Sequence, residues 1–546
     1  MLKEEPEKNH CIGLKGCIMI TESPLTLKEL LLQVRKPFFA IQKDDRVSFV
    51  LKDADFFKDT LQKDRDFHIR AYVPSIGPDN LGDAGFMARH GLKYPYIAGA
   101  MANGITTAAM VKTMAEHGMI GFFGAGGLSL DRIEEAVMDI KTTLGDKPFG
   151  FNLIHSLTDP AHEMATVNLY LKHRIRRISA AAFLRMTPAL VYYRVKGLHE
   201  DGNGNITAPN HIIAKVSRVE IARQFFSPPP EKLVRSLLEN RMITETEAKL
   251  SRYIPMARDL TAEADSGGHT DNRPALALLP TMMALKNEFM KTYQYTEPLC
   301  VGLAGGIATP ESAAAAFGMG AAYILTGSIN QSCVEAGICE DVKRLLCQAD
   351  QADTAMAPAA DMFEIGARVQ VLKRGTLFPV RAEKLYRLYQ SCHGFQEIDE
   401  KSQQEIQEKF LHSSFEEAWA STKEFFLKTG NTKEIERAET DPRHQMALVF
   451  RSYLGLSSKW AIQGIPERKM DYQIWCGPSM GAFNQWAKGS FLEPPENRKT
   501  AEIALNLLFG ACVRTRLSIL RTQGVDTESE AGVFNPLTLK EINSYL

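Results

Sequence analysis

Between about residue 94 and residue 330, short apolar runs of strand length alternate with longer segments of helical periodicity. Apolar runs of this kind are typical of parallel strands buried on both faces, and helical segments between them are typical of crossover connections. The pattern predicts eight strands, at residues 96–99, 121–123, 149–153, 177–181, 212–216, 260–264, 299–303 and 322–326. Eight β-then-α units favour an α/β fold of the closed (β/α)8 TIM barrel type, and an open doubly wound sheet is the alternative.

The predicted helices carry recognisable starts and apolar faces. The second begins at Ser129, and Ile133, Val137 and Ile140 recur at spacings of four and three, which places them on one buried face. The helix after the seventh strand begins at Thr309, with Pro310 at the first helical position.

Outside this region the pattern changes. Residues 1–90 form an N-terminal arm or small domain, with an apolar patch at residues 12–20 and a candidate strand at 46–51. Residues 91–350 form the barrel domain. It is interrupted by an insertion at about residues 227–258, which is expected to be a helical hairpin and, if it lies on the active face, to gate or select substrate. Residues 351–546 show helical periodicity and little that resembles a strand, so a mostly helical C-terminal region is expected.

The last two predicted strands each end in a glycine-containing turn. These turns comprise Gly305, Gly306 and Ile307 in the first, and Thr326, Gly327 and Ser328 in the second. Glycine lets the backbone turn sharply and bring its N–H groups close to an anion, and the loops after the last two strands of TIM barrels frequently hold a phosphate. One such turn is also typical of an ordinary strand end, but two at consecutive strand ends predict a phosphate site.

The other strand ends supply mostly small residues. Ala100 and Met101 follow the first strand, Asn152 lies in the third, and Lys215 lies in the fifth. A flat space with a phosphate site at one side suits FMN, with the Lys215 charge and the Asn152 amide near the flavin ring. The alternative for Lys215 is a solvated lysine.

The loop at residues 265–272 follows the sixth strand and contains Gly267, Gly268 and His269. An imidazole directly after a barrel strand is accessible to substrate, so His269 is the candidate catalytic residue, although a lone histidine is often structural. Asp265, Asp271 and Asn272 are more ambiguous, because such residues frequently bond only to their own turn.

Composition narrows the class of protein. The formal net charge of −1 favours neither nucleic acid nor a membrane surface as a partner. The sequence contains no run of eighteen apolar residues, so a membrane-spanning helix is not expected. The nine cysteines show no metal-ligand spacing, so no metal site is expected, and their odd number fits reduced thiols in the cytoplasm.

Four segments carry a resemblance to a known family: YIAGAMANGI at residues 96–105, GFFGAGGL at 121–128, AEADSGGHTD at 262–271 and AMAPAADMFE at 355–364. Together they resemble the PfaD-type trans-acting enoylreductases of polyunsaturated fatty-acid and trans-acyltransferase polyketide synthases. More distantly, the chain is similar to the FabK-type enoyl reductases and the nitronate monooxygenases. In that superfamily the Gly-Gly-His turn carries the active-site histidine, which falls on His269.

The resemblance implies an oxidoreductase that uses FMN and NADPH to reduce an α,β-unsaturated thioester carried by an acyl carrier protein. The substrate class follows from the resemblance alone. Two alternatives stay open, a nitronate monooxygenase-like flavin oxidase and a barrel without redox activity that serves as a binding subunit of a synthase. An oligomer is also compatible with the sequence.

Overall fold

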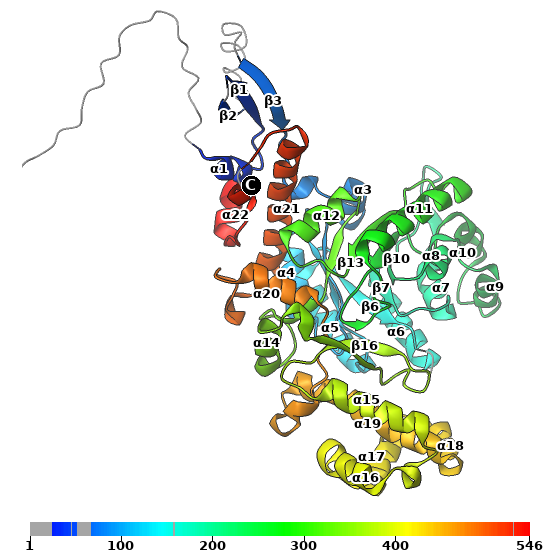
Figure 1. Ribbon diagram of the computed structural model, residues 1–546. Helices are drawn as coiled ribbons and strands as arrows, with labels where there is room; N and C mark the ends of the chain where they lie inside the picture. The colour runs from blue at the N-terminus through cyan, green and yellow to red at the C-terminus, as the bar shows by residue number, and fades with distance from the viewer. Residues whose placement is uncertain (1–24, 45, 52–66, 157–158, 528) are drawn as a thin grey trace, which may run out of the picture. The chain divides into compact units, whose positions relative to one another are not determined.

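The computed structural model describes residues 25–44, 46–51, 67–156, 159–527 and 529–546 (Figure 1). Their contacts form two compact units. Unit 1 comprises the chain up to Gly77 with residues 512–534 and 543–546, and unit 2 comprises residues 78–511 and 535–542. The domain boundaries expected near residues 90 and 350 remain an interpretation of the sequence pattern.

Unit 2 contains a closed barrel of eight parallel strands, which confirms the predicted fold. In barrel order these strands are β4 (Tyr96–Ala98), β5 (Ile120–Phe123), β6 (Gly150–Ile154), β7 (Arg177–Ala181), β10 (His211–Val216), β11 (Asp259–Glu263), β13 (Cys300–Ala304) and β14 (Ile324–Thr326). Every residue of β4, β5, β13 and β14 is buried, as expected for strands covered on both faces.

Helices surround the barrel in the order that the sequence predicts. They are α4 (Ala108–Glu116), α5 (Leu130–Leu144), α6 (Pro160–Lys172), α7 (Pro188–Val195), α8 (Val219–Phe226), α11 (Ala275–Tyr293), α12 (Pro310–Gly318), α13 (Ser328–Gln331) and α14 (Glu340–Cys347). The second of them buries Ile133, Val137 and Ile140 as predicted. The Thr309 side chain caps α12, with proline at the first helical position.

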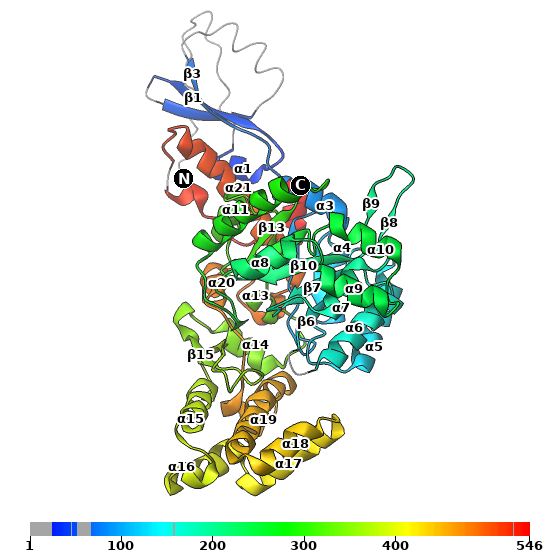
Figure 2. The same cartoon turned by 90° about the vertical axis from the view of Figure 1, so that its right-hand side faces the viewer.

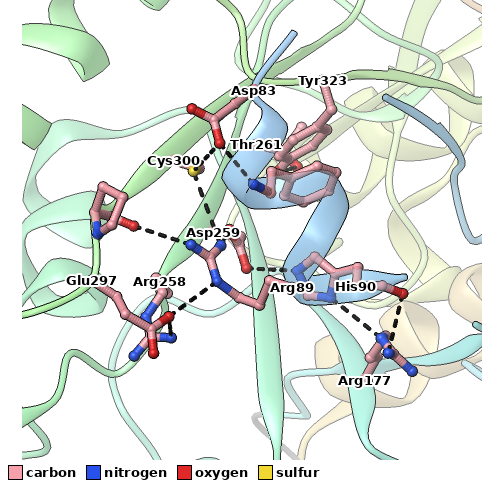
Figure 3. A network of polar contacts seen from close by, with 12 residues as sticks. Asp83, Arg89, His90, Arg177, Arg258, Asp259, Thr261, Glu297, Cys300 and Tyr323 are labelled. Atoms are coloured by element: carbon pink, nitrogen blue, oxygen red, sulfur yellow. Dashed lines mark hydrogen bonds and ion pairs between the residues drawn. The ribbon is translucent and has the colours of Figure 1, made fainter. Parts of the chain in front are cut away.

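One further helix, α3 (Ala84–His90), closes the barrel at the N-terminal end of its strands. Its Phe86 stacks on Tyr323 with ring centroids 4.2 Å apart, within an apolar cluster inside the barrel. Figure 3 shows Arg89 and His90 pointing at Asp259, the first residue of β11. Arg89 Nη1 lies 2.6 Å from Asp259 Oδ1 and His90 Nε2 lies 2.9 Å from Oδ2, so each oxygen of this buried carboxylate is contacted by a side chain of the same helix.

The insertion is the expected helical hairpin, formed by α9 (Glu231–Glu239) and α10 (Glu245–Leu250). It lies on the connection that enters β11. The Glu247 carboxylate accepts from the N–H of Gly197 at 2.6 Å, and Lys196 donates to the Met242 carbonyl at 2.8 Å, both ahead of β10. The hairpin therefore packs at the N-terminal end of the strands, so the condition for a gating role, a place on the active face, is not met. Figure 2 shows α10 beside the small hairpin of β8 (His199–Glu200) and β9 (Ile206–Thr207), on the side of α3.

The C-terminal region is mostly helical, as predicted. Its helices are α15 (Phe378–Ser391), α16 (Glu400–Glu405) continued by a π-helix (Ile406–Leu411), α17 (Phe415–Lys428), α18 (Thr432–Thr440), α19 (Pro442–Gln463), α20 (Ser479–Ala487), α21 (Thr500–Thr522) and α22 (Leu539–Tyr545). Figure 1 shows α15 to α19 gathered at one end of unit 2, with β16 between them and the barrel helices.

The sequence analysis missed one sheet in this region. Strands β15 (Thr354–Pro358) and β16 (Arg368–Leu372) form an antiparallel hairpin, and β12 (Gly268–His269) pairs with β16 as the third strand. This sheet joins the loop after barrel strand β11 to the C-terminal region.

Unit 1 contains helix α1 (Leu27–Leu32) and an antiparallel sheet of β1 (Phe38–Lys43), β2 (Arg46–Leu51) and β3 (Phe67–Val73), in the order β2-β1-β3. The predicted strand at residues 46–51 is confirmed. The apolar patch at residues 12–20 lies outside the described residues. Among those that are described, only α21 has the length and apolar composition of a membrane span, and 78% of that apolar window is buried in the protein.

Candidate active site

The C-terminal ends of β11, β13 and β14 lie side by side, because these strands are neighbours in the barrel. Leu303 pairs with Ile324 and Ala304 with Leu325, and Glu263 pairs with Ala304. The barrel thus brings together the 265–272 loop and the two glycine turns that the sequence indicated.

The turn after β13 requires both of its glycines. Gly305 and Gly306 have φ of +83° and +75°, which side chains disfavour. A Cβ on Gly305 would lie 2.6 Å from the Ala264 carbonyl carbon, so this turn packs closely against the end of β11, whereas a Cβ on Gly306 would meet nothing within 4 Å. Gly306 therefore faces open space.

Backbone N–H groups of both glycine turns are available as donors. Within the described residues, no hydrogen bond is made by the N–H groups of Gly306, Ile307, Gly327 and Ser328. The side chain of Ser328 accepts from the N–H of Gly477 at 3.1 Å, while the Thr326 hydroxyl is buried and contacts Tyr96 and Asn330. The turns therefore offer N–H groups to an anion, whereas the Thr326 hydroxyl is already engaged by Tyr96 and Asn330.

The remaining predicted cofactor residues lie on neighbouring strand ends. Ala100 and Met101 follow β4, and the N–H of Met101 donates to the Thr106 hydroxyl at 2.9 Å. Asn152 is 4% exposed, and its Oδ1 accepts from the N–H of Gly126 at 3.1 Å, which ties β6 to the loop after β5.

Lys215 is not a solvated lysine. Its Nζ lies 2.7 Å from the Oε1 of Glu263, and the two side chains are 25% and 14% exposed. Glu263 also accepts from the Ser266 hydroxyl at 3.2 Å. The sequence analysis missed Glu263 as a site residue, although it lies in the quoted AEADSGGHTD segment.

His269 is held in position by both its backbone and its side chain. Its backbone belongs to β12 and pairs with Val369, and its Nε2 lies 3.0 Å from Asp361 Oδ1. Partial burial disfavours the charged ring, but the hydrogen bond and charge of Asp361 outweigh burial and raise the pKa of His269 above its ordinary value. The side chain is 45% exposed, so it is accessible to a substrate.

The rest of the 265–272 loop is held by contacts with residues far away in the sequence, which the sequence analysis did not predict. Asp271 pairs with Arg218 at 2.9 Å, and this hydrogen bond lowers the pKa of Asp271 to about 2. Gln370 of β16 donates to both the Asp265 carboxylate and the Ser266 carbonyl at 2.8 Å. A Cβ on Gly267 would lie 2.9 Å from the backbone of Cys476 and Gly477, so the C-terminal region packs directly on this loop.

Asp361, Gln370 and the 475–477 segment were not predicted as site residues. The alternating pattern of residues 368–372, Arg-Val-Gln-Val-Leu, is the one signal in the sequence that indicates a strand there.

Comparison with known proteins agrees with this geometry. A family model described as "Nitronate monooxygenase" matches residues 86–386, more than half of the chain. A second, described as the inserted helical domain of [acyl-carrier-protein] S-malonyltransferase, matches residues 392–472. A crystal structure of the enoyl reductase domain of MlnA from Bacillus amyloliquefaciens is 40% identical with a TM-score of 0.76, and the match covers 81% of this chain and 98% of that domain.

Two curated proteins are also similar. The polyketide biosynthesis protein PksE of Bacillus subtilis is 47% identical over 79% of this chain, and a component of the polyunsaturated fatty acid synthase of Thraustochytrium is 42% identical over 84%. The chain spans 56% of the length of the first relative and 31% of the second. The chain therefore belongs to the nitronate monooxygenase family, and within it to the PfaD-type enoylreductases.

Proposed function

We propose that the protein is an FMN-dependent enoylreductase that acts in trans, using NADPH to reduce α,β-unsaturated acyl thioesters carried by an acyl carrier protein. One observation carries the proposal. Two glycine turns whose N–H groups have no partner among the described residues lie at strand ends next to the loop of a half-exposed, carboxylate-paired histidine. The chain that carries them is 40% identical to an enoyl reductase domain across nearly all of that domain. A polyketide biosynthesis protein and a polyunsaturated fatty acid synthase subunit among the relatives support the carrier-bound substrate, and the cytoplasm is the compartment we propose.

The site residues fit FMN. The N–H groups of Gly306, Ile307, Gly327 and Ser328 would hold its phosphate, in the open space beside Gly306. Lys215 and Asn152 would lie along the ring, with Glu263 fixing the lysine side chain. Bound FMN would supply hydride from NADPH to the β-carbon of the substrate.

Reduction of the double bond also requires a proton at the α-carbon. His269 is placed to provide it or to orient the thioester carbonyl, because its ring is accessible and its raised pKa favours the protonated form. Either role needs only the side chain that β12 and Asp361 already position.

A nitronate monooxygenase-like oxidase is the second candidate, since the family model that matches the barrel is named for that activity. It would share the flavin and His269 but use oxygen. A barrel that only binds substrate within a synthase is the third.

Two measurements separate these functions. The visible spectrum of purified protein distinguishes a flavoprotein from a non-redox binding protein. NADPH oxidation driven by an enoyl thioester, compared with oxygen consumption driven by a nitronate, distinguishes the two enzymes. Turnover with the nitronate alone would contradict the proposal.

A further inference from the structure

The pair of His269 and Asp361 connects the C-terminal region to the candidate catalytic residue. His269 lies at the end of β12, and Asp361 lies 92 positions later, in the loop between β15 and β16. The Nε2 of His269 lies 3.0 Å from the Asp361 carboxylate, and the described residues offer no hydrogen-bond partner to Nδ1. The ring therefore presents Nδ1 to whatever binds beside it.

The loop that carries Asp361 is itself anchored. Arg451 of α19 donates from Nε to the Ala360 carbonyl at 2.9 Å, and its Nη1 lies 3.0 Å from the Glu364 carboxylate. Residues on both sides of Asp361 are thus held by one guanidinium. Arg451 lies in the segment that matches the inserted helical domain of a malonyltransferase.

We propose that Asp361 is the positioning residue of the active site, and that the helical C-terminal region, through Arg451, holds it where it keeps His269 oriented as the proton donor. The proposal rests on the enoylreductase function stated above. Asp361 itself contacts no substrate in this scheme.

The proton balance fits this geometry. When hydride has reached the β-carbon, the α-carbon holds an electron pair. The Nδ1–H bond of the imidazolium breaks, the Cα–H bond forms, and the neutral ring keeps its Nε2–H, still donated to Asp361. Water then reprotonates Nδ1, which the 45% exposure of the side chain permits.

Three other influences act on the charge of His269. Glu263 of β11 favours the charged ring, Lys215 of β10 disfavours it, and partial burial opposes it. Asp361 is the only one of these groups that is hydrogen-bonded to the ring in the part of the chain that the structure describes. Removing Asp361 should therefore change the pKa and orientation of the His269 ring more than removing Glu263 or Lys215 would.

The test is a histidine NMR titration, which needs no substrate. Protein with 13C-labelled histidine is titrated without flavin and with FMN, and the His269 signal is assigned by its loss in His269→Ala. We expect the His269 midpoint of wild type to lie above that of an ordinary histidine and to fall in Asp361→Asn. The matched control is Asp271→Asn, which removes a carboxylate two positions from His269 that bonds Arg218 instead. Equal midpoints in Asp361→Asn and wild type, or equal falls in both variants, would overturn the proposal.

Arg451→Met tests the role of the C-terminal region, because the loss of its charge and the loss of its anchoring should shift the pKa of His269 in opposite directions. Loss of a nearby cation by charge alone raises the pKa of a histidine. Loss of the Asp361 position lowers it, so we expect a lower midpoint in Arg451→Met, and a raised or unchanged midpoint contradicts the proposed anchoring.

The kinetic readout is separate. The alkaline limb of kcat/KM for enoyl thioester reduction should move to lower pH in Asp361→Asn, because the ring then loses its proton at lower pH. Absence of enoyl reduction in wild type would overturn the proposed function while leaving the titration result intact. An unmoved alkaline limb in an active Asp361→Asn enzyme would overturn the positioning role alone.

Discussion

At the scale of single residues, the pair of Lys215 and Glu263 decides how the lysine can act on a bound cofactor. A lysine alone at a strand end would add a full positive charge beside a bound cofactor, whereas its contact at 2.7 Å with a largely buried carboxylate offsets much of that charge and restricts the side chain. The lysine is therefore better suited to donate a directed hydrogen bond than to act as a diffuse charge.

His269→Ala should keep its flavin and lose the step that needs the imidazole. Positioned acid–base groups contribute about 10²–10⁴-fold, so reoxidation of the reduced protein by an enoyl thioester should slow by that factor in stopped-flow measurements. Reduction by NADPH should change little. Equal slowing of both half-reactions would mean that His269 shapes the whole site, and no slowing would make it a structural histidine.

Gly306→Asp should lose flavin while keeping its fold. The substitution puts a negative charge beside N–H groups that have no partner in the described part of the chain, and the space around Gly306 accommodates the side chain. The backbone cost of a side chain at positive φ is about 1–2 kcal/mol. Flavin content after reconstitution should fall, with far-UV circular dichroism near that of wild type.

Gly430→Asp is the matched control for that substitution. Gly430 has φ of +72°, close to the value at Gly306, and also faces open space, but it lies between α17 and α18. It should incur the same backbone cost and retain its flavin. Full flavin occupancy in Gly306→Asp would place the phosphate elsewhere.

At the scale of elements, α3 shows how the barrel is closed at the end opposite the site. Burial opposes the charge of Asp259, but His90 and Arg89 outweigh burial and lower the pKa of Asp259 to about 2. Arg177 donates to His90 Nδ1 at 3.3 Å, which orients the imidazole so that Nε2–H faces the carboxylate. The network holds α3 and the strands β7 and β11 together.

Asp259→Asn should destabilise the protein strongly. Removing the carboxylate leaves the buried Arg89 guanidinium without the counter-charge that lies 2.6 Å from it, which typically costs about 3–5 kcal/mol. Asp139→Asn, which breaks an exposed pair with Lys112, should cost about 1 kcal/mol or less. Urea unfolding at pH 7 measures both, and equal effects would show that the buried network contributes no more than a surface pair.

The Asp259 carboxylate also makes the free energy of unfolding depend on pH in acid. Because the folded-state pKa of Asp259 is depressed, its stabilising contribution is fully present above its unfolded pKa of about 4 and is lost as the pH falls toward about 2. The difference in unfolding free energy between wild type and Asp259→Asn should therefore narrow between pH 4 and pH 2. A constant difference over that interval would assign the effect to packing.

At the scale of the whole molecule, the chain separates into two units that are stabilised by different contacts. Unit 2 is built around the barrel and the C-terminal helices. Unit 1 is built around Arg516, which is fully buried and donates to the carbonyls of Leu30, Gln33 and Lys36 at 2.8–3.2 Å. Its guanidinium also lies 5.1 Å from the Phe38 ring centroid.

Arg516→Met should loosen unit 1 and leave the barrel unchanged. Each buried carbonyl left without a donor costs about 1–3 kcal/mol. Hydrogen exchange should become faster in β1 and β3, while exchange in β13 and flavin content stay as in wild type. Arg521→Met, at an exposed position near the end of the same helix, is the control, and faster exchange in the barrel would show that the units are not independent.

Much of the fold follows from local pattern. Strand and helix positions in the barrel were predictable because burial on both faces requires continuous apolar runs. The turn after β13 was visible because its positive φ at Gly305 and Gly306 disfavours other residues. Residues 354–358 and 368–372 were missed, since two short strands among many helices have too few alternating positions to stand out.

The partners of the site residues depend on tertiary structure. Periodicity shows which face of an element is buried, but not which distant segment covers it. Lys215 meets Glu263 because β10 and β11 are adjacent, and His269 meets Asp361 because β12 pairs with a strand about 100 positions away. Likewise the inserted hairpin lies away from the site because the connection that carries it leads into the N-terminal end of β11, opposite the strand ends that form the site. Local sequence thus decided the barrel, its turns and the candidate histidine, whereas only the folded chain decided the charge and orientation of that histidine, because both arise from contacts between segments far apart in sequence.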